Sequence, residues 1–194
     1  MQTTNVTLVG VGGQGILLTA DVLARAAAEA GLDAKKSEIH GMSQRGGSVS
    51  SQVRFGAAVL SPIVPAGETD LLVAFDVVEA IRAFALVRPE GKALVDRKYM
   101  VPVTVSSGMQ PPPEDPEGAL AKLFAGRLFR IDSAALALQA GNPRTANMAI
   151  AGALSTLLPI PEGAWDAALR GRIPAKLLEP NLKAFALGRA AAAR

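Results

Sequence analysis

The distribution of apolar residues along the chain predicts short strands that alternate with helices. Residues Asn5 to Gly10 form an apolar run that is too short for a stable helix, so we expect a buried strand there. From Ile16 to Ala30 apolar residues recur at three- and four-residue spacing, which predicts a helix that Gly31 ends. The chain therefore opens as a strand, a glycine-rich loop and a helix, which is the beginning of a βαβ unit.

The alternation continues along the rest of the chain. We expect strands at 33–39, 48–55, 70–75, 92–96 and 127–131, an extended segment at 101–105, helices at 77–87 and 118–125, and helical segments from there to the end. This order indicates an α/β fold, with a Rossmann-like, mostly parallel sheet, helices on both faces and a helical carboxyl terminus. No repeat or Gly/Ser linker divides the chain, and the proline-rich stretch 110–117 is expected to be a surface loop, so residues 1–194 are predicted to form one domain.

Composition narrows the classes of function. The 194 residues are 49% hydrophobic and 19% charged, which is typical of a packed globular protein. The net charge of +3 comes from scattered basic residues, and only 4% of the residues are aromatic, so a nucleic-acid site is not expected. Neither a secretory signal nor a membrane-spanning run is visible, which favours a cytoplasmic protein.

The chain has no cysteine and a single histidine, His40. It therefore cannot supply thiolate ligands to zinc or to an iron–sulfur cluster, and no metal site is expected. A lone histidine beside a loop is more often a hydrogen-bonded anchor than an acid or base. Ser43 is not a hydrolase nucleophile, because Arg45 stands where the G-x-S-x-G motif needs glycine.

A first glycine-rich loop follows the first predicted strand. Gly10, Gly12 and Gly15 match G-x-G-x-x-G between a strand and a helix, with Gly13 and Gln14 inside the motif. Glycines allow backbone N–H groups to approach a phosphate, and the helix that follows adds the positive end of its dipole. Glu38 stands about 20 residues further on, where a ribose-binding acid is found in dinucleotide sites. The alternative is that the glycines only allow tight packing of the strand against the helix.

A second glycine-rich loop combines a permissive backbone with donors and one fixed positive charge: Gly41, Ser43, Gln44, Arg45, Gly46 and Gly47. Successive N–H groups can form an anion-binding nest, and an arginine offers a planar fork to a carboxylate or phosphate. The alternative is that Gln44 and Arg45 tie the loop to neighbouring carbonyls or to a partner chain. Two further polar sites are more simply helix caps than ligand contacts, namely Asp76 and the run from Asn142 to Asn147.

The two loops in this order resemble the gamma-type domain of 2-oxoacid:ferredoxin oxidoreductases. Within that family, the sequence His40-Gly41-Met42-Ser43-Gln44-Arg45-Gly46-Gly47-Ser48-Val49 is most similar to the small (beta) subunits of the indolepyruvate type. The resemblance implies a complex that converts an arylpyruvate and coenzyme A to an acyl-CoA, carbon dioxide and reduced ferredoxin. It also implies that a large partner subunit holds thiamine diphosphate and the iron–sulfur clusters, in a heterotetramer that could include a contact between two copies of this chain.

The absence of cysteine agrees with that division of labour, because the electrons must travel through another polypeptide. The resemblance places the two loops on the coenzyme A and substrate side, so the predicted binding residues are Gly10, Gly12, Gly13, Gln14, Gly15, Ser43, Gln44, Arg45, Gly46 and Gly47. Two alternatives stay open. One is a stand-alone NAD(P)- or flavin-binding oxidoreductase, and the other is a purely structural subunit.

Overall fold

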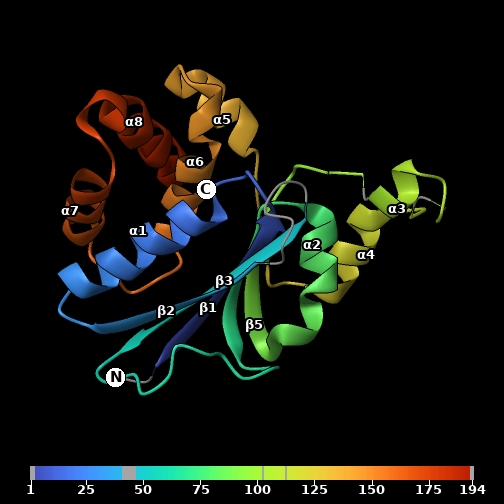
Figure 1. Ribbon diagram of the computed structural model, residues 1–194, viewed down its shortest axis with the longest axis horizontal. Helices are drawn as coiled ribbons and strands as arrows, with labels where there is room; N and C mark the ends of the chain where they lie inside the picture. Colours follow the sequence, from blue (N-terminus) through green and yellow to red (C-terminus); the bar gives the residue numbers. More distant parts are fainter. Residues whose placement is uncertain (1–2, 41–46, 102, 112, 193–194) are drawn as a thin grey trace.

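The computed structural model describes residues 3–40, 47–101, 103–111 and 113–192. Within these residues the chain forms a six-stranded sheet in the order β2-β3-β1-β4-β5-β6 (Figure 1). The strands are β1 (Thr4–Val11), β2 (Asp33–His40), β3 (Ser48–Gly56), β4 (Thr69–Ala74), β5 (Val87–Asp96) and β6 (Leu128–Ile131). The strands β1, β4, β5 and β6 are neighbours and run parallel, which confirms the mostly parallel sheet.

One strand departs from this pattern. β3 lies between β2 and β1 and is antiparallel to both. Only the loop at 41–47 joins β2 to β3, and a parallel pair needs a much longer crossover connection, usually a helix. The carboxyl end of β2 and the start of β3 therefore lie beside the carboxyl end of β1, where Val11 is opposite Ser48 and His40 is opposite Val49.

Helices cover both faces of the sheet, as predicted (Figure 1). The helical elements are α1 (Ile16–Glu29), α2 (Val77–Arg82), the 3₁₀ helix η1 (Phe84–Leu86), α3 (Val103–Ser106), α4 (Pro116–Leu123), α5 (Ser133–Ala140), the 3₁₀ helix η2 (Pro143–Thr145), α6 (Ala146–Ser155), α7 (Glu162–Arg172) and α8 (Ala175–Ala192). Alternate side chains of β4 enter two cores. Leu71 and Val73 join the core with α1, α6, α7 and α8, whereas Leu72 and Ala74 join the core with α2 and α4.

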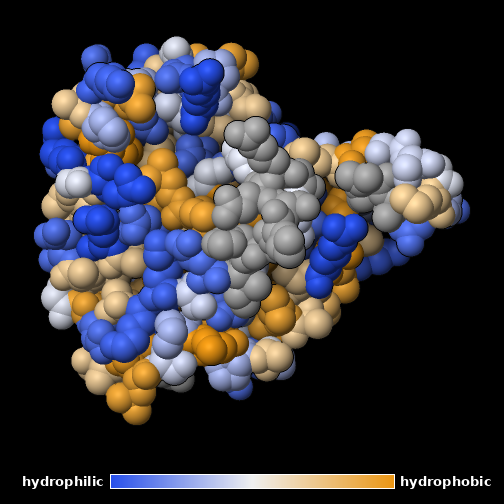
Figure 2. Space-filling view, viewed as in Figure 1, coloured by the Kyte–Doolittle hydropathy of each residue, from blue (hydrophilic) through white to orange (hydrophobic). Residues whose placement is uncertain are grey.

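Two predicted elements differ from the structure. The extended segment expected at 101–105 contains the short helix α3 instead, and the helix expected at 77–87 ends at Arg82, with β5 already beginning at Val87. The part of the chain that carries α3 and α4 projects from the body of the molecule (Figure 2). Valines at 101, 103 and 105 favour a strand, but α3 lies away from the sheet, and β propensity has effect only where a neighbouring strand is present.

The helices α6 and α8 cross at unusually close range. A Cβ atom on Gly152 would fall on the carbonyl oxygen of Phe185, and one on Gly188 would fall on the carbonyl oxygen of Ala149. The two glycines therefore let the backbones approach. Among the described residues, no helix combines the length and apolar character that crossing a membrane requires.

Candidate functional site

The carboxyl ends of β1, β4, β5 and β6 meet at one edge of the sheet and open on a cavity of about 760 Å³. Each strand contributes lining residues that directly follow it or lie in the next loop: Gly13 and Gln14 after β1, Phe75 after β4, Arg97 and Lys98 after β5, and Asp132 after β6. Residues of α5 and α6 line the remaining side. Open α/β sheets bind their ligands at this edge. The first glycine-rich loop therefore lies at the ligand-binding edge of the sheet.

The hydrogen bonds of this loop show which of its donors remain available. The Gly12 N–H donates to the Gly47 carbonyl at 2.9 Å, and the Gln14 N–H donates to the Val11 carbonyl at 3.2 Å. Gly13 and Gly15 have positive φ angles of 99° and 85°, and within the described residues their N–H groups have no acceptor. α1 follows directly and has no side-chain cap. The loop thus leaves two backbone donors beside a helix amino terminus.

The side chain of Gln14 is engaged within the protein. Its Oε1 accepts the Val11 N–H at 2.7 Å, and its Nε2 donates to the Phe75 carbonyl at 3.2 Å and contacts Sδ of Met100 at 3.3 Å. A Cβ on Gly10 would lie 2.5 Å from that Oε1. Gly10 therefore leaves space for the Gln14 side chain, and both residues help to fix the conformation of the loop.

The second glycine-rich loop is described only at its end. Gly41, Ser43, Gln44, Arg45 and Gly46 lie outside the described residues. Gly47 is described, and its carbonyl accepts the Gly12 N–H, so the two loops meet there. The next residue, Ser48, donates its hydroxyl to the buried carboxylate of Glu79 at 2.6 Å, which fixes the start of β3 to α2.

Basic side chains outnumber carboxylates among the residues that line the cavity. The carboxylate of Asp96 accepts the Ser133 N–H at 3.0 Å and the Ser133 hydroxyl at 2.6 Å, and burial raises the pKa of Asp96. Asp132 accepts the Ala135 N–H and caps α5. Both carboxylates are thus engaged, while Arg97, Lys98 and Arg144 line the same cavity, and none of the three forms an ion pair with another described residue.

A second cavity of about 350 Å³ also borders the glycine-rich loop, and residues of α1, α6 and the start of α8 line it. Its apolar walls include Leu18, Ile173 and Leu177. The two cavities share four lining residues, Gly13, Gln14, Arg144 and Asn147. An elongated ligand could therefore contact both cavities at the glycine-rich loop.

The predicted caps are partly confirmed. Asp76 accepts the N–H groups of Val78 and Glu79 at the start of α2, and burial raises its pKa. Asn142 accepts the Arg144 N–H and caps η2. Asn147 caps nothing, because the residue before α6 is Thr145 and has no side-chain cap contact.

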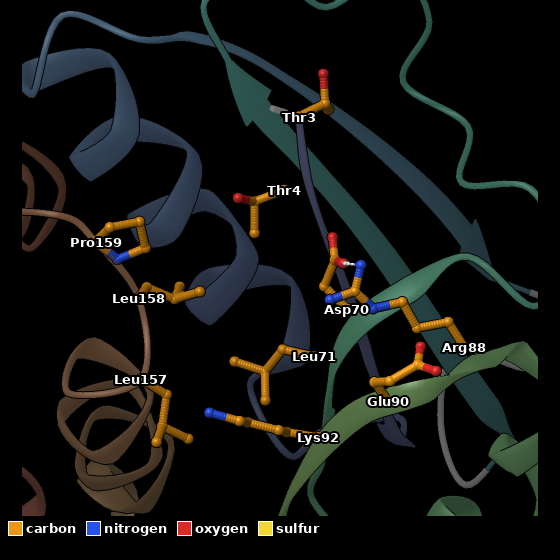
Figure 3. A pocket seen from close by; sticks show the side chains of 10 residues that line it. All are labelled: Thr3, Thr4, Asp70, Leu71, Arg88, Glu90, Lys92, Leu157, Leu158 and Pro159. Carbon is orange, nitrogen blue, oxygen red and sulfur yellow. Dashed lines mark ion pairs between the residues drawn. The ribbon is translucent and has the colours of Figure 1, made fainter. Parts of the chain in front are cut away.

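A third cavity lies at the opposite, amino edge of the sheet (Figure 3). It measures about 260 Å³, and its central feature is an ion pair at 2.6 Å between Asp70 and Arg88. Asp70 also accepts the Asn5 N–H at 2.6 Å, so this carboxylate links β4 to β1 and β5. The arrangement is structural, and it is remote from the glycine-rich loop. No cluster of three His, Asp or Glu side chains suited to a metal ion occurs in the described part of the chain.

Strand order bears on the alternative of a dinucleotide site. In that site the ribose-binding acid ends the strand beside the first strand. Here β3 separates β2 from β1, and the exposed Glu38 on β2 forms an ion pair with Lys36 at 2.7 Å. The geometry therefore does not place Glu38 next to the loop after β1.

These features define an α/β protein with a glycine-rich loop and basic side chains at the carboxyl edge of its sheet. Comparison with known proteins extends this class to a family: residues 5–191 match the model of the pyruvate ferredoxin/flavodoxin oxidoreductase family. The chain belongs to this family of oxidoreductases, which confirms the resemblance stated from the two loops.

The relatives agree over nearly the whole length. The chain is 37% identical to the indolepyruvate oxidoreductase subunit IorB of Thermococcus kodakarensis, over 97% of this chain and 95% of that protein. It is 38% identical to the subunit IorB of Pyrococcus horikoshii, with the same coverage.

Solved structures show the same fold. The gamma subunit of a keto/oxoacid ferredoxin oxidoreductase from Geobacter sulfurreducens superposes with a TM-score of 0.73 at 24% identity, and 98% of each chain is covered. A 2-oxoglutarate:ferredoxin oxidoreductase from Magnetococcus marinus, with 2-oxoglutarate, coenzyme A and succinyl-CoA bound, gives the same TM-score at 25% identity. The match covers all of this chain and 31% of that one.

Sequence reasoning missed several residues at the site. Arg97 and Lys98 directly follow the predicted strand at 92–96, so their place at a strand end was the available signal. Arg144 and Asn147 lie in a polar run that sequence reasoning favoured as a cap. Nothing in the sequence indicates that this run packs against the glycine-rich loop, because the two are far apart along the chain.

Proposed function

We propose that this chain is the small subunit of an indolepyruvate-type 2-oxoacid:ferredoxin oxidoreductase, and that its carboxyl edge forms part of the coenzyme A site. The family match and the IorB relatives support the first part. The observation that carries the second is the 760 Å³ cavity, which is lined by Arg97, Lys98 and Arg144 together with Gly13, one of the two residues of the loop with an available N–H. Coenzyme A carries a diphosphate and a further phosphate, which are the groups that such donors and cations bind.

The reaction requires a partner. A 2-oxoacid loses its carboxyl group as carbon dioxide, its acyl group is transferred to the thiol of coenzyme A, and the released electron pair reduces ferredoxin. A large subunit would hold the thiamine diphosphate and the iron–sulfur clusters, since this chain has no cysteine. The small subunit then contributes the wall that binds coenzyme A.

Gly13→Ala tests the coenzyme A site in the assembled two-subunit enzyme. The substitution adds a methyl group beside the Gly13 N–H, at a residue with a φ of 99° and open space around it. We expect the KM for coenzyme A to rise roughly tenfold, the loss of about one good hydrogen bond, with little change in the KM for the oxoacid. Kinetics of ferredoxin reduction at varied coenzyme A provide the measurement.

The matched control is Gly67→Ala. Gly67 also has a positive φ, 78°, and open space around it, but it lies in the loop between β3 and β4 at the amino edge. It should carry the same backbone strain without the effect on coenzyme A. Equal KM changes in the two variants would reject the proposed site.

Arg45→Ala tests the second loop, whose role rests on the sequence motif. We expect a higher coenzyme A requirement in the assembled enzyme if Arg45 contacts the ligand, and weaker assembly if it contacts the large subunit. Titration of the large subunit separates the two effects. Unchanged kinetics together with unchanged subunit affinity would discard both roles.

A further inference from the structure

Asn147 is an exception among the buried polar residues of the described chain. It is 6% exposed, and its side-chain amide forms no hydrogen bond with any described residue. Every other buried polar or charged residue has a side-chain partner, among them Asp76, Glu79, Asp96 and Asn181. An unpartnered buried amide costs about 1–3 kcal/mol, so the retained asparagine calls for a partner outside the described residues.

The Asn147 amide faces the cavities. Among the described residues, two side-chain nitrogen atoms are fully buried and have no hydrogen-bond partner, namely Nε of Arg88 and Nε1 of Trp165. The amide of Asn147 is not among these atoms, and Asn147 lines both the 760 Å³ and the 350 Å³ cavity. The side chain of Asn147 therefore lies where the two cavities adjoin.

The glycine-rich loop makes the space that Asn147 occupies. A Cβ atom on Gly15 would lie 2.6 Å from Nδ2 of Asn147 and 2.8 Å from its Cγ. The hydroxyl of Thr19, one turn into α1, hydrogen-bonds the backbone carbonyl of Asn147 at 3.4 Å and fixes α6 against α1. The amide is thus held directly over the segment that carries the available N–H groups of Gly13 and Gly15.

We infer that Asn147 is a specificity-determining residue that hydrogen-bonds an amide group of the ligand, namely the pantetheine arm of coenzyme A. This inference rests on the proposed function. A side-chain amide has both a donor and an acceptor, and a peptide-like amide satisfies both, whereas a phosphate would leave Oδ1 unpaired. The phosphates have Arg97, Lys98 and Arg144 in the larger cavity, and the arm passes Asn147 toward the apolar walls of the smaller one.

Asn147→Leu separates a ligand contact from a structural role. Leucine has the same number of side-chain heavy atoms and the same branching at Cγ, and it removes the unpartnered amide, so the ligand-free protein should melt at the same temperature or higher. In the assembled enzyme the KM for coenzyme A should rise roughly tenfold while kcat at saturating coenzyme A changes little. A lowered melting temperature with an unchanged KM would show that Asn147 is structural and would overturn the inference.

A second ligand tests which half of coenzyme A is recognised. Adenosine 3′,5′-bisphosphate lacks the pantetheine arm, and we expect it to protect the wild-type enzyme and the Asn147→Leu variant equally against thermal unfolding. Protection by coenzyme A should be weaker in the variant. Equal weakening for both ligands would assign Asn147 to the nucleotide half and overturn the inference.

Measurements on the wild-type enzyme distinguish failure of the proposed function from failure of the role of Asn147 alone. If coenzyme A neither protects the wild-type complex nor is required for turnover, the proposed function itself fails. If wild type and Asn147→Leu both bind coenzyme A with the same affinity, the proposed function stands and only the role of Asn147 fails.

Discussion

The glycines of the glycine-rich loop at the carboxyl edge have different structural roles. Gly10 makes room for the side chain of Gln14, Gly15 makes room for Asn147, and Gly13 has nothing within 4 Å of where a Cβ would lie. Gln14 ties the loop to Phe75 after β4 and to Met100 after β5. The motif therefore serves packing and ligand access at once, at different glycines.

Gln14→Leu should destabilise the protein. The substitution leaves the Val11 N–H and the Phe75 carbonyl without their side-chain partner in a part-buried site. We expect the free energy of unfolding to fall by about 1–3 kcal/mol, measured by urea denaturation. Gln139→Leu, at an exposed position on α5, should change it by less than about 0.5 kcal/mol. Similar values for the two variants would contradict the structural role of Gln14.

At the scale of elements, the packing of α6 on α8 positions the wall that carries Asn147. α6 is buried along nearly its whole length, and Gly152 and Gly188 bring its backbone against that of α8. α1 contacts α6 through Thr19. The site is therefore held by regular elements rather than by loops alone.

Gly152→Ala and Gly188→Ala should each lower stability by about 1–3 kcal/mol or more, because the added methyl group meets backbone carbonyls that cannot move independently. Gly163→Ala and Gly171→Ala provide the control. They lie in α7 with open space around them, and helix propensity should make the protein more stable by up to about 1 kcal/mol. Thermal unfolding of all four variants gives the comparison, and a neutral Gly152→Ala would show that the helices can separate at no cost.

At the scale of the whole molecule, the two edges of the sheet differ in character. The carboxyl edge holds the two cavities that share the glycine-rich loop, while the charged groups at the centre of the amino edge are paired with each other. Two carboxylates are buried without an ion-pair partner among the described residues. Asp76 and Asp96 are almost fully buried, and burial raises the pKa of each.

Stability should respond to the titration of Asp96. Because its pKa is raised above the ordinary 3.8, the folded protein holds a proton at pH values where the unfolded chain has lost it. Ionisation therefore opposes folding above the raised pKa, and this penalty disappears as the pH falls through that pKa toward 3.8. Relative to Asp96→Asn, the wild-type protein should gain stability on acidification. Urea unfolding at a series of pH values measures the difference, and a difference independent of pH would refute the assignment.

The sequence by itself determined the local features of this protein. The apolar periodicity and the glycine-rich loop located β1 and α1, and the motifs of the two loops identified the family, because such signals depend on neighbours within a few turns. The mostly parallel sheet followed from the order of elements.

Only the tertiary structure decided the rest, because it depends on contacts between distant segments. The antiparallel β3 between β2 and β1 moved Glu38 away from the loop, and the bond from Gly12 to Gly47 removed one donor from it. Asn147 packs on Gly15, and its side-chain amide therefore lies at the junction of two cavities. From the sequence alone, this residue was favoured as part of a helix cap. Local pattern specifies what a residue can do, and packing between distant segments determines which of its groups stay free to do it.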